Sequence, residues 1–222
     1  MCIRDSGEKG HRAESGAMKI LDLARDITGY GYNILMFDLR GHGESEGKRA
    51  SAGYHDTKDL LGAIDYVKQR DIHKIGVIGF SMGAATALLT AANCKEIDAV
   101  VADSSFADLA DIVESEFSKR SSLPKFFVPL IRFMARSMYG IDLSRLKPAD
   151  AVRQLSALPI LVIHGGQDET IPVKHAGELV SSSSSPHSRV WIVPEAQHVG
   201  CYQSRPEAYV NQVISFFQKV LC

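Results

Sequence analysis

Short apolar runs alternate with longer amphipathic stretches along most of this chain. Five runs are almost continuously apolar and rich in β-branched residues, which predicts strands buried on both faces of a parallel sheet: 33–39, 74–80, 97–102, 159–164 and 189–194. Apolar residues three or four apart predict helices at about 16–29, 53–70, 82–93, 174–181 and 205–221. The alternation predicts a single α/β domain with a mostly parallel sheet of about five strands, flanked by helices.

Residues 104–156 interrupt this alternation and contain no clear strand. Within them, the segment 121–140 is apolar over a broad arc. Such a pattern fits two helices packed over the sheet, a cap that shapes an acyl pocket, or a helix that lies at a membrane interface. We predict a helical cap insertion over about 104–156.

Composition narrows the possible partners and compartments. The chain has 222 residues, is 45% hydrophobic and carries a net charge of -1, so one sizeable core is expected and nucleic acid is not an expected partner. Its four cysteines, Cys2, Cys94, Cys201 and Cys222, are widely spaced, which favours neither a disulfide framework nor a zinc site. No apolar run reaches the roughly 18 residues that span a membrane. We expect a cytoplasmic or membrane-associated protein.

The pentapeptide Gly79-Phe80-Ser81-Met82-Gly83 lies where a predicted strand gives way to a predicted alanine-rich helix. A GxSxG pattern alone is weak, but this context is the one that a nucleophile elbow requires. The sharp turn displays Ser81 beyond the carboxyl edge of the sheet, and glycine avoids collisions on either side of it. The N–H of Met82, at the helix N-terminus, is suited to stabilise an oxyanion.

A serine hydroxyl needs a base, and that base needs an acid to orient it. His198 follows the last predicted strand and is the candidate base, whereas Asp168, just beyond the strand 159–164, is the candidate acid. Asp103 also ends a strand and is the rival acid, and Asp38 is a weaker one. The remaining histidines are interpreted as structural or solvated: His11, His42, His55, His73, His164, His175 and His187. The resulting order is the Ser…Asp…His order of α/β-hydrolases.

Four motifs in the same order carry a resemblance to a known family: NILMFDLRGHGESEG, GFSMGAATAL, ILVIHGGQDETIP and AQHVGCY. Together they resemble the α/β-hydrolase superfamily, in its bacterial serine-aminopeptidase-like or lysophospholipase-like branch. The resemblance covers residues 7–222 as one domain. It implies that Ser81 is the nucleophile, Asp168 the acid and His198 the base, with no metal or organic cofactor and a variable cap within 104–156.

The beginning of the chain departs from that family. Residues 1–6 (MCIRDS) resemble a translated sequencing adapter and are interpreted as a leader foreign to the native protein. The family's third strand, which lies between the strands matching 33–39 and 74–80, is expected to be absent. Each buried backbone group left unpaired there would cost about 1–3 kcal/mol, so we expect a truncated, unstable or weakly active fragment.

The same departure affects the second donor to the oxyanion. In the family, a His-Gly-x loop after the third strand supplies it through the N–H of residue x. Gly7 matches the glycine, which makes Glu8 the candidate donor, but Ser6 stands where the histidine is expected.

These features predict a serine hydrolase that cleaves an ester, thioester or amide through an acyl-enzyme, with carboxylesterase-like or lipase-like activity. The expected partner is a small-molecule acyl substrate. Membrane association is expected only through an absent N-terminal segment or the cap helix, and the oligomeric state is left open. A serine peptidase or an acyltransferase on the same residues is the enzymatic alternative, and a non-catalytic binding module of the same fold is the other.

Overall fold

The computed structural model describes residues 2–4, 20–43, 45–46, 54–120, 142, 145–155 and 157–221. Its centre is a six-stranded sheet in the order β2-β1-β3-β4-β5-β6, in which every neighbouring pair is parallel. The strands are β1 (Cys2–Arg4), β2 (Met36–Asp38), β3 (Gly76–Phe80), β4 (Ala99–Asp103), β5 (Ile160–Gly165) and β6 (Arg189–Val193). Since all six are parallel, their carboxyl ends share one edge of the sheet.

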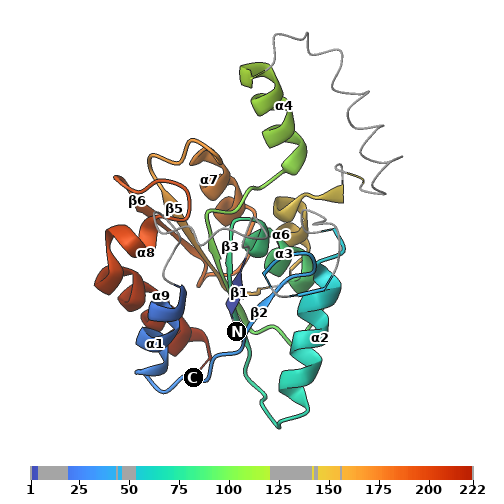
Figure 1. Cartoon of the computed structure of the whole chain (residues 1–222), viewed down its shortest axis with the longest axis vertical. Coiled ribbons are helices and arrows are strands. Elements are labelled where there is room, and N and C mark those ends of the chain that lie inside the picture. Colours follow the sequence, from blue (N-terminus) through green and yellow to red (C-terminus); the bar gives the residue numbers. More distant parts are fainter. Residues whose placement is uncertain are drawn as a thin grey trace.

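Helices cover both faces of this sheet (Figure 1). One face carries α2 (Thr57–Lys68), α3 (Met82–Ala91), α6 (Pro148–Gln154) and α7 (Lys174–Ser181). The other carries α1 (Ile20–Thr28), α8 (Cys201–Ser204) and α9 (Pro206–Leu221). Helix α4 (Leu109–Arg120) follows β4 and extends away from the sheet (Figure 1).

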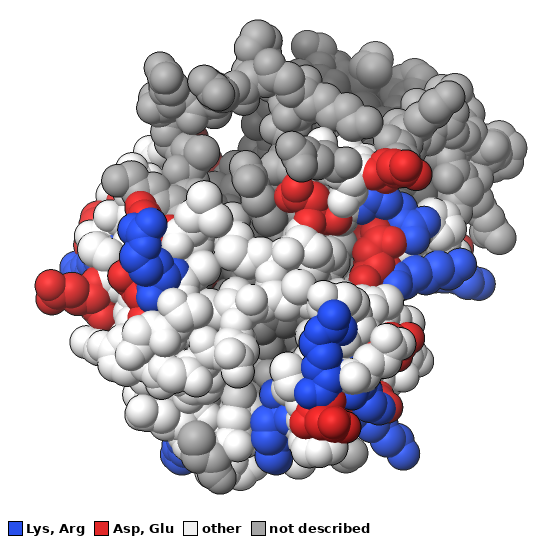
Figure 2. Space-filling view, turned by 60° about the horizontal axis from the view of Figure 1, so that its bottom comes forward, with Lys and Arg blue, Asp and Glu red and all other residues white. Residues whose placement is uncertain are grey.

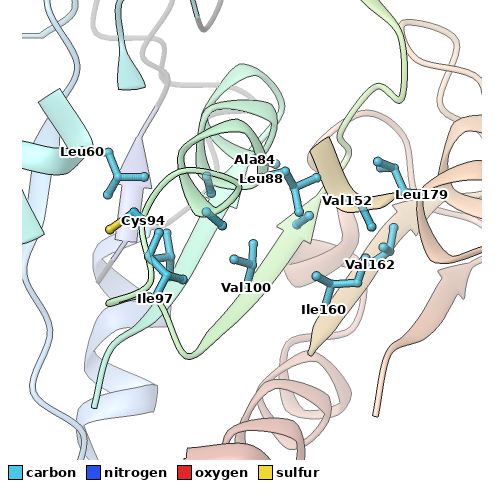
Figure 3. Close-up of a cluster of buried hydrophobic side chains, with 14 of the residues drawn as sticks. Leu60, Ala84, Leu88, Cys94, Ile97, Val100, Val152, Ile160, Val162 and Leu179 are labelled. Atoms are coloured by element: carbon cyan, nitrogen blue, oxygen red, sulfur yellow. The ribbon is translucent and has the colours of Figure 1, made fainter. Parts of the chain in front are cut away.

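The core consists of two apolar layers separated by the sheet. On the first face, Leu60 of α2 and Leu88 of α3 pack over Val100 and Val162 of the central strands (Figure 3). On the second face, Tyr209 and the other apolar residues of α9 pack against the same strands. Because every residue of β4 and β5 is buried, both strands need apolar side chains at successive positions, which explains the apolar runs 99–102 and 160–163.

All five strands expected from the sequence are present, with ends shifted by a few residues. The expectation that no strand lies between β2 and β3 is wrong. Cys2–Arg4 forms a short strand there, pairing with Met36–Asp38 on one side and with Ile78 and Gly79 on the other. An extended segment in this position satisfies backbone groups that both neighbours would otherwise leave unpaired, which is the physical reason for its pairing.

The range expected for a cap is described only in part. Its last helix, α6, packs onto α3 and contributes Ala149 and Val152 to the core. The segment 121–141 lies outside the described residues, so the cap stays a prediction. Within the described ranges, no helix has both the length and the apolar character needed to cross a bilayer.

Charged side chains of opposite sign lie next to one another on the surface in view in Figure 2. Exposed pairs such as Lys68 with Glu96 and Arg205 with Glu195 are of this kind. Mixed charge of this kind differs from the basic stripe typical of nucleic-acid-binding surfaces.

Candidate active site

Ser81 lies at the sharp turn between β3 and α3. Its backbone has φ 50° and ψ -117°, a strained conformation for a residue with a side chain, and its N–H donates to the carbonyl of Asp103 over 2.8 Å. A Cβ at position 79 would approach the carbonyl oxygen of Gly83 to 2.4 Å, so only glycine permits this close crossing of strand and helix. The turn therefore projects Ser81 from the carboxyl edge of the sheet.

Three side chains from distant parts of the sequence form a hydrogen-bonded row at this edge. His198 Nε2 lies 2.9 Å from Ser81 Oγ, and His198 Nδ1 lies 2.7 Å from Asp168 Oδ2. A carboxylate at Nδ1 favours the tautomer that carries its proton there, which leaves the Nε2 lone pair to accept the serine O–H. The geometry brings together the three residues that the sequence analysis selected.

Asp168 is held in its ionised form by the groups around it. Burial raises the pKa of its carboxyl, but the hydrogen bonds from His198 and from the Ile171 N–H outweigh this effect, so its pKa lies below the ordinary value. Oδ1 accepts the N–H groups of Thr170 and Ile171 at 2.9 and 2.8 Å. His164 Nε2 donates to the carbonyl of Ile171 over 2.8 Å, which stabilises the same turn.

Gly165, the last residue of β5, and Gly166, which follows it, allow the Asp168 turn to pack directly on the loop that carries His198. A Cβ at Gly165 would approach the carbonyl oxygen of Ala196 to 2.3 Å, and one at Gly166 would approach that of Pro194 to 2.7 Å. Backbone hydrogen bonds join the two segments, including Gln167 N–H to Ala196 O at 2.9 Å. The distance between acid and base is thus set by backbone packing.

A family model for serine aminopeptidase, S33 (Hydrolase_4), matches residues 10–154. The chain belongs to this family of α/β-hydrolases.

Relatives and solved structures agree with this placement. The uncharacterized protein YqkD of Bacillus subtilis is 29% identical over 92% of this chain and 67% of its own length, and YfhR of Salmonella typhi is 30% identical over 85% and 63%. The chain thus spans about two thirds of the length of these relatives. The esterase Pf2001 of Pyrococcus furiosus superimposes with a TM-score of 0.76 at 26% identity, covering 100% of this chain and 83% of that one.

This hydrolase also has a buried hydrogen-bonded network next to the site, which the sequence analysis did not predict. Asp103, weighed there as a rival acid, accepts hydrogen bonds from Ser104 Oγ at 2.9 Å and from Tyr209 Oη at 2.9 Å. Ser104 Oγ in turn accepts the N–H of Val199, next to His198, at 3.0 Å. The available signal was the polar run Asp-Ser-Ser, which begins at the last residue of β4.

Burial raises the pKa of Asp103 to about 6, because the cost of desolvating the charge exceeds the effect of the Tyr209 and Ser104 hydrogen bonds.

The two residues that the sequence analysis proposed as oxyanion donors are Met82 and Glu8. Met82 begins α3, so its N–H is among the helix N-terminal groups that lack an intrahelical acceptor. Glu8 lies outside the described residues.

Two cavities bordered by described residues lie away from the row of Ser81, His198 and Asp168. One cavity, of about 390 Å³, is lined by residues of α1, α2, α9 and the segments preceding β2 and β3. Another, of about 490 Å³, is lined by residues of α2 and of the chain around β2, and none of Ser81, Asp168 and His198 lines either cavity. In the described part of the chain, no group of three or more His, Cys, Asp or Glu side chains is arranged to hold a metal ion.

Proposed function

We propose that this α/β-hydrolase is a serine hydrolase that cleaves carboxylic esters of small acyl substrates. The observation that carries the proposal is the hydrogen-bonded row Ser81–His198–Asp168 at a strained strand-to-helix turn. Similar solved structures that are named as esterases, such as Pf2001, support the same activity. A thioester or an amide carbonyl would react by the same steps.

In this proposal Ser81 Oγ attacks the carbonyl carbon while His198 Nε2 takes the hydroxyl proton. The negative charge that develops on the carbonyl oxygen is stabilised by the Met82 N–H and by the positive end of the α3 dipole. Asp168 holds the imidazole in the productive tautomer and stabilises the imidazolium. The proton then passes from His198 to the leaving group, and water hydrolyses the acyl-enzyme by the reverse sequence.

The proposal keeps Glu8 as the candidate second donor to the oxyanion. It requires no cofactor, because the attack, the proton transfers and the charge stabilisation are all assigned to Ser81, His198, Asp168 and the Met82 N–H. The small-molecule acyl substrate remains a proposal, since the chain spans about two thirds of the length of YqkD and YfhR.

A serine peptidase is the second candidate, and the family's description as serine aminopeptidase favours it. Hydrolysis of alanine p-nitroanilide separates the two, because p-nitrophenyl butyrate is an activated ester that serine esterases and serine peptidases both cleave. We expect the ester to be cleaved and the anilide not, and the variant Ser81→Ala to lose roughly 10⁴- to 10⁶-fold in kcat for the ester. Ser81-dependent cleavage of the anilide would favour the peptidase, and ester cleavage that survives Ser81→Ala would refute both.

Ser105→Ala is the matched control for this loss. Ser105 is a fully buried serine close to the site whose hydroxyl donates to the carbonyl of Phe106 at 3.1 Å. We expect this variant to retain the wild-type kcat within about threefold.

A further inference from the structure

A continuous chain of buried polar groups runs behind His198. It begins at Tyr209 on α9, passes through the Asp103 carboxylate at the end of β4 and the Ser104 hydroxyl, and ends at the Val199 N–H. Tyr209, Asp103 and Ser104 are fully buried. The Tyr209 and Ser104 hydroxyls each donate to one oxygen of the carboxylate, and Ser104 also accepts the Val199 N–H. These hydrogen bonds therefore connect α9 in the core to Val199, the residue that follows the candidate base His198.

Both residues joined by the last hydrogen bond have a strained backbone. Ser104 has φ 53° and Val199 has φ 55°, both in the left-handed region that residues with side chains avoid. For the β-branched Val199 this conformation is a genuine outlier, of the kind that persists only where the surrounding structure imposes it. In this conformation the Val199 N–H donates to the Ser104 hydroxyl at 3.0 Å.

The same stretch of chain also fixes the nucleophile. The carbonyl of Asp103 accepts the Ser81 N–H at 2.8 Å, and Ser104 N–H donates to the carbonyl of Ile163 in β5 at 2.9 Å. The backbone of residues 103–104 thus supports the Ser81 turn while the Ser104 side chain supports the His198 loop. One rigid segment sets the positions of two members of the row.

We infer that Ser104, anchored by Asp103, is a positioning residue that holds the His198 imidazole in line with Ser81 and Asp168. The expected fall in kcat rests on the proposed function, whereas the orientation of the His198 imidazole does not. Without the hydroxyl, the Val199 N–H loses its buried acceptor and the strained conformation loses its support. His198 then samples orientations in which its 2.9 Å contact with Ser81 is not made.

Two substitutions at Ser104 separate positioning from general stability. Ser104→Ala removes the hydroxyl and keeps the strain, whereas Ser104→Gly removes the hydroxyl and relieves the strain, because glycine tolerates a positive φ. We expect both variants to lower kcat for p-nitrophenyl butyrate by about 10- to 100-fold, with KM within about threefold of wild type. Ser105→Ala, an equally buried neighbour, is expected to keep the wild-type kcat.

Melting temperatures of the same variants distinguish a positioning role from a purely structural one. If Ser104 were only structural, the kinetic loss would follow the fall in melting temperature and Ser104→Gly would recover activity. The inference instead predicts a Ser104→Gly variant that melts higher than Ser104→Ala and is no more active. Recovery of wild-type kcat in Ser104→Gly would overturn it.

A proton NMR measurement tests the positioning without reference to turnover. An imidazole N–H hydrogen-bonded to a carboxylate gives a far-downfield resonance, which the wild-type chain should show for His198 Nδ1–H. We expect this resonance to broaden or disappear in both Ser104 variants and to persist in Ser105→Ala and Ser81→Ala. An unchanged resonance in the Ser104 variants would refute the inference, whereas a chain with the resonance and no Ser81-dependent turnover would refute the proposed function alone.

Discussion

Gly165→Ala is the substitution that most directly tests how the site is assembled. Gly165 ends β5 and lies against the loop that carries His198, where an added Cβ would be 2.3 Å from the carbonyl oxygen of Ala196 and 2.6 Å from that of Gln197. Both obstacles are backbone atoms, which cannot rotate away as a flexible side chain would. The loop must therefore move as a unit.

The size of that movement follows from the contact. Bringing the 2.3 Å approach to 3.0 Å, the lower limit for real Cβ contacts, requires a shift of about 0.7 Å. His198 follows Gln197 directly and makes hydrogen bonds of 2.9 and 2.7 Å, so a shift of this size is enough to break one of them. We expect kcat to fall by about 10²-fold and the free energy of unfolding to fall by about 1–3 kcal/mol.

The assay is p-nitrophenyl butyrate hydrolysis combined with urea unfolding. Gly177→Ala is the matched control, because Gly177 lies exposed on α7 and a Cβ there meets no atom within 4 Å. That variant should keep its kcat and gain up to about 1 kcal/mol from the better helix propensity of alanine. A Gly165→Ala variant with wild-type kcat would refute the argument that backbone packing sets the distance between Asp168 and His198.

Two further predictions concern the buried carboxyls. Asp168→Asn should lower kcat by about 10⁴-fold with little change in KM, because an amide does not hold the Nδ1–H tautomer of His198; exposed Asp150→Asn is its control, and an equal loss in both would contradict the assignment. Asp103 has a folded-state pKa of about 6 against an ordinary 3.8, so its contribution to stability is complete below about pH 3.8 and is lost as the pH rises through 6. The variant Asp103→Asn does not titrate, so its free energy of unfolding relative to wild type should be higher at pH 8 than at pH 3.5 by up to about 3 kcal/mol. Urea unfolding at the two pH values measures this, and a variant-to-wild-type difference that is the same at both would contradict the prediction.

The fold was predictable because its strands are buried on both faces. Val100 to Ala102 and Ile160 to Ile163 have no polar side to present, so the sequence is apolar without interruption and easily recognised. The short strand Cys2–Arg4 was not predicted, since three residues carry no periodicity and their pairing depends on the gap between β2 and β3.

The row of Ser81, His198 and Asp168 was predictable because parallel strands bring their carboxyl ends to one edge, so position after a strand predicts proximity. The catalytic roles of the three residues remain predictions. The support given by Ser104 was not predictable, because it depends on a hydrogen bond to the backbone of Val199, 95 residues away. No spacing rule relates a hydroxyl to a distant backbone N–H.

The central claim is that Ser81 is a nucleophile activated by His198. The direct measurement is covalent labelling by a fluorophosphonate, followed by mass spectrometry of the intact chain and of the peptide that contains the GFSMG turn. The account predicts one phosphonyl adduct, on Ser81, with labelling abolished in Ser81→Ala, strongly slowed in His198→Ala and unchanged in Ser105→Ala. Absence of an adduct on the folded wild-type chain, or an adduct that persists in Ser81→Ala, would contradict it.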